Sequence, residues 1–206
     1  MRRRARNNSG QILVFSICIL LLLMMTSVRT SLLEDWRAQL PPGTPLGDAT
    51  LRWTTGCVPF VRTPDARFAD LPDFPFDPHY VTVPHAGTPD GVRVHYLDEG
   101  PRDAAPVLLV HGEPSWSFLY RSMIPVLVAV GHRVVAPDMP GFGKSDKPKK
   151  DSAHRFDWHR QVLLQFVEAL DLQGIHLVVQ DWGGILGLTL PMAAPQRYQG
   201  LLVMNT

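Results

Sequence analysis

The stretch LVVQDWGGILGLTL, residues 177–190, decides the fold. An apolar run, 175–180, is typical of a buried strand; it ends at Asp181, and two glycines then lead into an apolar helix. A strand, a sharp turn and a helix in this order predict a nucleophile elbow, which usually presents Ser or Cys. Here the residue at the turn is an aspartate. A carboxylate is suited to displacement at a saturated carbon or an epoxide, through an ester on the enzyme.

Short apolar segments alternate with amphipathic ones throughout the second half of the chain. Strands are expected at 92–100, 106–114, 132–137, 176–180 and 201–205, and helices at 118–130, 156–170 and 182–193. This alternation indicates an α/β class, with a mostly parallel sheet covered by helices on both faces. Ligands of such sheets bind beyond the carboxyl ends of the strands. Glu113 and Asp181 both fall there, so they are expected to share a site.

The chain divides into three parts by composition. Residues 1–30 combine four arginines among the first six residues with an apolar run at 12–25, the layout of a secretory signal or a membrane anchor. The run is shorter than the roughly 20 residues that cross a bilayer. Export to the periplasm or medium, or anchoring to a membrane through 12–25, is expected if this N-terminus is genuine; a wrongly assigned start codon would leave a cytoplasmic protein. Residues 31–59 are expected to be a linker, and 60–206 the globular part.

Composition excludes several classes of function. The net charge of +1 offers no basic face for nucleic acid beyond the N-terminal arginines. Cys18 and Cys57 cannot build a disulfide framework or a CxxC metal site, and neither a cofactor nor a metal is expected. The run GFGKS, 141–145, is like the tail of a phosphate-binding loop, but Asp138 stands where that loop needs glycine. We interpret it as a turn-rich surface loop. Oligomeric state is left open.

Three residues are the candidates for chemistry at the elbow. Asp181 is the candidate nucleophile, and a backbone N–H in HGEPSW, 111–116, is expected to join that of Trp182 in an oxyanion hole. The indole N–H of Trp182 could also hold an anion beside apolar surface. Plainer readings stay open: Asp181 as a helix N-cap, Trp182 as core packing and Glu113 as a surface carboxylate. His111 is expected to be hydrogen-bonded loop structure rather than a base.

Three motifs together resemble the haloalkane dehalogenases of the α/β-hydrolase superfamily: HGEPSWSFLYR (111–121), VVAPDMPGFGKSDKP (134–148) and LVVQDWGGILGLTLPM (177–192). The resemblance runs from about Val61 to Thr206. It implies an α/β-hydrolase fold and a halogenated hydrocarbon as substrate. It also implies that Asp181 is the nucleophile, that Trp182 holds the halide, and that Glu113 lies by the oxyanion hole and the hydrolytic water. Glu113 together with Trp116 resembles the branch that handles short chlorinated alkanes.

The chain departs from that family after the elbow. The superfamily order is nucleophile, acid and histidine, yet no Asp, Glu or His follows Asp181. We therefore expect a fragment that stops before the cap and the last strands, and that can form an alkyl ester but not readily hydrolyse it. The strand at 201–205 is expected to leave an apolar edge exposed, which would make this polypeptide marginally stable or prone to aggregate.

Two alternatives remain beside dehalogenation. Epoxide hydrolases resemble this chain in an aspartate followed by WGG and in a similar HG-x-P loop, although Glu113 and GFGKSDKP argue against that activity. A membrane-tethered remnant without turnover would explain both the missing base and the N-terminal apolar run.

Overall fold

The computed structural model describes residues 60–85 and 88–206. The expected leader and linker, 1–59, lie outside the described residues. The strands are β1 (Phe60–Val61), β2 (His79–His85), β3 (Thr88–Glu99), β4 (Pro106–Val110), β5 (Arg133–Pro137), β6 (Lys147–Pro148), β7 (Ile175–Gln180) and β8 (Tyr198–Met204). The α-helices are α2 (Met123–Ala129), α3 (Phe156–Ala169), α4 (Trp182–Gly187) and α5 (Thr189–Ala193). The 3-10 turns are η1 (Asp65–Phe68), η2 (Ser117–Tyr120), η3 (Asp151–Ala153) and η4 (Pro195–Arg197).

Six strands form the main sheet, in the order β2-β3-β5-β4-β7-β8. The pairs β5-β4, β4-β7 and β7-β8 are parallel, whereas β2-β3 and β3-β5 are antiparallel. The mostly parallel sheet expected from the sequence is therefore confirmed. The strand β2 was not expected; because only one of its seven residues, Val83, is fully buried, its apolar signal is weak.

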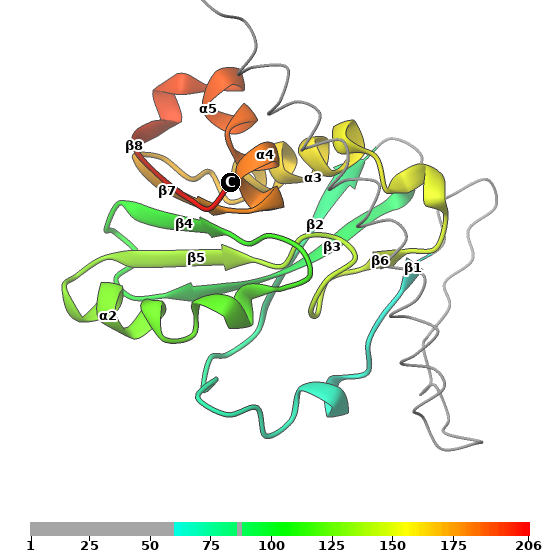
Figure 1. Ribbon diagram of the computed structural model, residues 1–206, viewed down its shortest axis with the longest axis horizontal. Coiled ribbons are helices and arrows are strands. Elements are labelled where there is room, and N and C mark those ends of the chain that lie inside the picture. The colour runs from blue at the N-terminus through cyan, green and yellow to red at the C-terminus, as the bar shows by residue number, and fades with distance from the viewer. Residues whose placement is uncertain (1–59, 86–87) are drawn as a thin grey trace, which may run out of the picture. The chain divides into compact units, whose positions relative to one another are not determined.

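Helices cover both faces of this sheet, as Figure 1 shows for α3, α4 and α5 on one side and α2 on the other. Alternation along β4 explains the two layers: Leu108 and Val110 pack in the core with α3 and α4, while Val107 and Leu109 pack in the core with α2. Successive side chains of a strand point to opposite faces, so an almost wholly apolar strand requires cover on both.

Two expected helices are interrupted. The segment expected to be helical at 118–130 is the turn η2 followed by α2, and the segment at 182–193 divides at Leu188 into α4 and α5. Near this break, the Thr189 hydroxyl donates to Leu186 O at 2.7 Å, and Pro191 lacks the N–H that would continue the ladder. Apolar spacing therefore marked the right segments without showing where the backbone changes direction.

The strand β8 forms one edge of the sheet and exposes apolar side chains, as the sequence led us to expect. Leu201, Leu202 and Val203 expose 54%, 53% and 46% of their surface. Because these three are consecutive, both faces of the strand are uncovered at this edge. An exposed apolar edge strand is a template for pairing with another chain.

Replacing Leu202 with lysine is expected to raise the soluble monomeric fraction of the 206-residue chain several-fold, because a charge on an edge strand opposes intermolecular pairing. Sedimentation and light scattering measure the fraction. Leu119→Lys is the matched control, since Leu119 is exposed on the turn η2 rather than on a strand edge. Equal gains from the two variants would mean that β8 is not the aggregating surface.

The imidazole of His159 lies near the start of α3. Burial, together with the nearby imidazoles of His154 and His85, lowers the pKa of His159 to about 4. The unfolded chain therefore binds this proton more readily between pH 6.5 and 4, and the folded state loses stability as the pH falls through that window.

We expect the loss of stability between pH 7 and pH 4 to be about 2 kcal/mol smaller in His159→Gln than in the wild type. This value is reduced for the partial exposure of the ring. Urea unfolding of both proteins at the two pH values measures the difference. If the variant loses as much stability as the wild type, His159 is not a source of the acid sensitivity.

Among residues 60–85 and 88–206, no helix is long and apolar enough to cross a bilayer.

Candidate active site

The elbow is a tight turn between β7 and α4, with Asp181 at its apex. Asp181 has φ 53° and ψ −126°, a conformation unfavourable for a residue with a side chain, and one that costs of order 1–3 kcal/mol. Its N–H donates to Asn205 O at 3.2 Å, and its carbonyl accepts from Gly184 N–H at 2.8 Å. Neighbouring bonds on both sides therefore hold the strained turn in place. The nucleophile elbow predicted from the sequence has the expected backbone.

Glycine is required where α4 approaches the end of β4. A Cβ on Gly183 would lie under 3.0 Å from the carbonyl oxygens of Val110 and His111. Backbone atoms cannot give way as a flexible side chain can, so the start of α4 can pass β4 only with hydrogen at this position. The close packing sets Asp181 beside the loop that follows β4.

The Asp181 carboxylate meets that loop directly. Glu113 N–H donates to Asp181 Oδ1 at 3.0 Å. A Cβ on Gly112 would lie 2.5 Å from the same oxygen, so glycine is also required here. The structure thus brings the backbone of Glu113, 68 residues away in the chain, to the candidate nucleophile. Glu113 N–H is thus one of the two backbone donors that were expected beside Asp181.

The candidate residues are found at the carboxyl ends of neighbouring strands β4 and β7. Trp182 is the first residue of α4 and is partly buried, as are Asp181 and Glu113. The side chain of Asp181 makes no capping hydrogen bond to α4, so the reading of this residue as a side-chain N-cap is wrong. Its carboxylate is turned to the loop after β4 instead.

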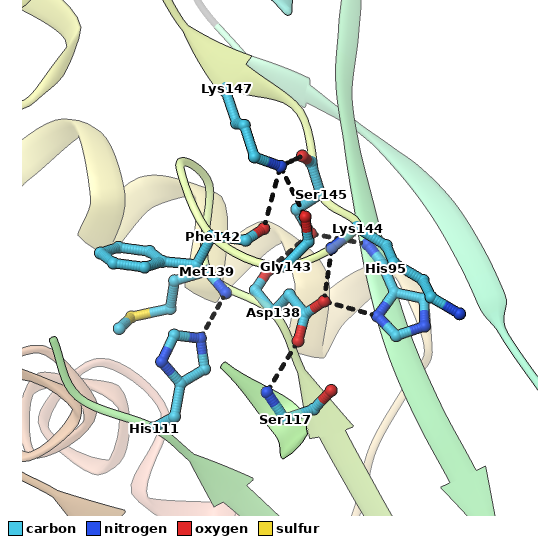
Figure 2. A network of polar contacts seen from close by, with 10 residues as sticks. All are labelled: His95, His111, Ser117, Asp138, Met139, Phe142, Gly143, Lys144, Ser145 and Lys147. Carbon is cyan, nitrogen blue, oxygen red and sulfur yellow. Dashed lines mark hydrogen bonds and ion pairs between the residues drawn. The ribbon is translucent and has the colours of Figure 1, made fainter. Parts of the chain in front are cut away.

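A buried polar network behind the site was not expected from the sequence (Figure 2). Asp138, which follows β5, is fully buried and accepts from His95 Nδ1 at 2.7 Å, from Ser117 N–H at 2.8 Å and from Lys144 N–H at 2.8 Å. Burial is the largest single influence on Asp138 and opposes its ionisation, but the contacts of His95, His111 and Ser117 N–H together outweigh it, and the pKa of this carboxyl is lowered. Asp138 therefore ties β3, the loop after β4 and the 141–145 segment together.

The interpretation of 141–145 as a turn-rich surface loop is right for the turns and for the partly exposed residues 141–144, and wrong for Ser145. Ser145 is fully buried, and its hydroxyl donates to Asp138 O at 2.6 Å while accepting from His95 N–H at 2.8 Å. Lys147 Nζ donates to Gly143 O at 2.6 Å and to Ser145 O at 2.9 Å. Burial lowers the pKa of Lys147 to about 8. The segment folds inward because its glycines allow the chain to wrap around the Asp138 carboxylate, which a Cβ on Gly143 would displace.

His111 is loop structure, as expected. It is fully buried at the end of β4; its Nε2 accepts from Met139 N–H at 2.9 Å, and its Nδ1 lies 2.9 Å from Gly112 O. Trp116, further along the same loop, packs its ring on Phe68, Phe74 and Phe118, with ring centroids 5.4, 5.2 and 5.5 Å away. The indole of Trp116 thus anchors the segment before β2 to the loop.

A strained aspartate between a parallel strand and a helix, faced by a backbone donor from the loop after the neighbouring strand, is typical of an α/β hydrolase. The family model of the alpha/beta hydrolase fold matches residues 105–206. Over its described part, the chain is similar to the N-terminal portion of the haloalkane dehalogenases of this superfamily.

Named relatives support this assignment. The chain is 54% identical over 146 residues to a haloalkane dehalogenase of Psychrobacter cryohalolentis, covering 71% of the chain and 48% of the relative. A Mycolicibacterium paratuberculosis haloalkane dehalogenase is 46% identical over 145 residues, covering 70% and 48%. The chain therefore spans about half the length of the curated relatives it matches.

Among the solved structures, a haloalkane dehalogenase is more similar to this chain in sequence than an epoxide hydrolase is. A haloalkane dehalogenase of Paraglaciecola agarilytica, described as tetrameric, is 53% identical with a TM-score of 0.67, covering 71% of this chain and 49% of that one. An epoxide hydrolase of Vigna radiata is 25% identical with a TM-score of 0.57, covering 64% and 40%. The epoxide hydrolases are thus the more distant neighbours.

Proposed function

We propose that this chain carries the nucleophilic half of a hydrolytic dehalogenation site, which converts a haloalkane and water to an alcohol, a halide and a proton. The observation that carries the proposal is the bond from Glu113 N–H to Asp181 Oδ1 at 3.0 Å. It supports a carboxylate that is held by one oxygen and reacts through the other.

In the first step, Asp181 Oδ2 forms a bond to the carbon that bears the halogen, and the carbon–halogen bond breaks. The electron pair leaves with the halide, to which the indole N–H of Trp182 can donate. The product is an alkyl ester of Asp181 and free halide. No proton moves in this step, so it needs neither a base nor a metal.

In the second step, water adds to the carboxyl carbon of the ester, and negative charge develops on Oδ1. Glu113 N–H already points at this oxygen and can stabilise the charge. Collapse releases the alcohol and regenerates the carboxylate, with a net release of one proton. A base must take that proton from the water, and the 25 residues after Asp181 contain no His, Asp or Glu. The side chain of Glu113 is proposed to lie near this water.

Incubating the 206-residue chain with 1,2-dibromoethane tests the proposal. We expect a 2-bromoethyl ester that accumulates on Asp181, released bromide equal to the protein present, and no adduct at this position in Asp181→Asn. Intact-protein and peptide mass spectrometry detect the ester, and ion chromatography measures the bromide. Continued bromide release would contradict a trapped intermediate, and an undiminished adduct in Asp181→Asn would exclude Asp181 as the nucleophile.

Epoxide hydrolysis is the second candidate, favoured by the structural likeness to the Vigna radiata enzyme. An epoxide needs a proton on its departing oxygen when the ring opens, whereas a halide leaves as a stable anion. Styrene oxide in place of 1,2-dibromoethane separates the two activities. An ester that forms with the epoxide at least as fast as with the dibromide would favour the epoxide hydrolase reading over dehalogenation.

Export or membrane anchoring is proposed for residues 1–30, with membrane association through 12–25, residues 31–59 as linker and 60–206 as the hydrolase core. The order of charged and apolar residues supports this. Fusing residues 1–30 to a reporter and fractionating cells tests it, with the four N-terminal arginines replaced as a control. A cytosolic reporter would support a later start, while a membrane-bound chain without any alkylation would favour a non-catalytic tethered remnant.

A further inference from the structure

The donor that faces Asp181 is one end of a peptide unit, and the other end of that unit is also bound. The N–H of Glu113 and the C=O of Gly112 belong to the same planar trans group, so they point in opposite directions. Fixing the direction of the carbonyl therefore fixes the direction of the N–H. Gly112 O accepts from Ser115 N–H at 3.1 Å and from the Ser115 hydroxyl at 2.9 Å, and it lies 2.9 Å from His111 Nδ1.

The proton on the His111 ring can be placed from its second contact. A backbone N–H only donates, so the bond from Met139 N–H requires a lone pair on His111 Nε2. In the neutral ring the proton is then on Nδ1, which donates to Gly112 O. Burial lowers the pKa of His111 and favours this neutral form.

The residue that holds His111 is itself held. Met139 follows Asp138, the centre of the network in Figure 2, and Asp138 Oδ1 accepts from Ser117 N–H at 2.8 Å. The loop 111–117 is thus tied at its start to Met139 and at its end to Asp138. The hydrogen bonds of this buried network hold the loop in one arrangement, although His95 Nε2 and the Ser117 hydroxyl have no hydrogen-bond partner among the described residues.

We propose that His111 is a positioning residue, which aims Glu113 N–H at Asp181 by donating from Nδ1 to the carbonyl of Gly112. The effect of His111 on the reaction rate rests on the proposed function, whereas its positioning of the Glu113 N–H does not. Among the described residues, the ring nitrogens of His111 contact Gly112 O and Met139 N–H rather than the carboxylate of Asp181. His111 acts by setting the rotation of one peptide unit.

Two polar variants separate the positioning contact from the structural one. His111→Asn keeps a donor near the place of Nδ1 and loses the acceptor for Met139 N–H. His111→Gln keeps an acceptor near the place of Nε2 and loses the donor to Gly112 O. If His111 acts through Nδ1, the Gln variant is the damaging one; if it merely ties the loop to Met139, the Asn variant is.

Hydrogen exchange of the Glu113 amide, resolved by mass spectrometry on the dilute 206-residue chain, is the first measurement. We expect exchange about tenfold faster in His111→Gln and near the wild-type rate in His111→Asn. The rate of Asp181 alkylation by 1,2-dibromoethane is expected to follow the same order, with a loss of about tenfold or more in His111→Gln. The reverse order, or no change in either variant, would overturn the proposal.

A measurement on the unaltered chain decides the matter if a variant fails to fold. Nitrogen NMR of chain labelled at histidine is expected to show His111 neutral with its proton on Nδ1; a proton on Nε2 would overturn the proposal. The two hypotheses also fail differently. Absence of any alkylation in the wild type, with the expected order of amide exchange, would reject the proposed function and leave the positioning role supported.

Discussion

Replacing Asp138 with alanine is expected to lower the free energy of unfolding by about 4 kcal/mol, because it leaves buried donors without their acceptor. The donors are His95 Nδ1 and the N–H groups of Ser117 and Lys144. His95 and Ser117 are fully buried, so water cannot replace the carboxylate. A domain is stable by only about 5–15 kcal/mol, so the variant should be close to unfolding at 25 °C. Urea unfolding followed by fluorescence measures the loss.

The matched control is Asp171→Ala. The carboxylate of Asp171, like that of Asp138, accepts a hydrogen bond. Its donor is Arg197 at 2.9 Å, but the Asp171 side chain is 78% exposed. Exposed ion pairs contribute little, so we expect only the small loss that alanine incurs at the positive φ of Asp171, 42°, well below the loss in Asp138→Ala. Similar losses in the two variants would show that the burial of Asp138 is not what makes it important.

Replacing Gly112 with alanine is expected to slow alkylation of Asp181 by about 100-fold, because the new methyl group and the carboxylate cannot occupy the same space. A Cβ at this position would lie 2.5 Å from Asp181 Oδ1. Either the carboxylate or the loop must shift, and both shifts break the bond from Glu113 N–H. Single-turnover mass spectrometry with 1,2-dibromoethane gives the rate.

Gly131→Ala distinguishes this steric effect from a general loss of stability. Gly131 has φ 89°, so alanine is strained there, yet nothing lies within 4 Å of the new Cβ. We expect a loss of about 1 kcal/mol of stability and an unchanged alkylation rate. A comparable drop in rate would mean that the alkylation assay reports stability rather than the geometry at Asp181.

The elbow was predictable because all its signals are local. An apolar strand, an aspartate and two glycines within ten residues specify a strand, a sharp turn and a helix, and the structure has them at β7, Asp181 and α4. The division of the helix at Leu188 was missed, since apolar spacing does not register a change in backbone direction.

The network around Asp138 was not predictable in the same way. Its partners His95 and Ser117 lie 43 and 21 residues away, and no periodic pattern connects them. Glycine, lysine and serine at 141–145 are typical of an exposed turn, and that local signal was misleading for the buried serine. The sequence does contain one signal: Asp138 is followed by Pro140, Gly141 and Gly143, which let the chain bend around a buried carboxylate.

The sequence by itself determined the α/β class, the elbow and the aspartate at its turn, because periodicity and residue type act over a few neighbouring residues. Only the tertiary structure decided which oxygen of Asp181 is held, which backbone N–H holds it and why glycine stands at 112. Those facts depend on the parallel pairing of β4 with β7, which places the ends of two distant segments side by side. The direction of a hydrogen bond is set by that packing, and no local pattern records it.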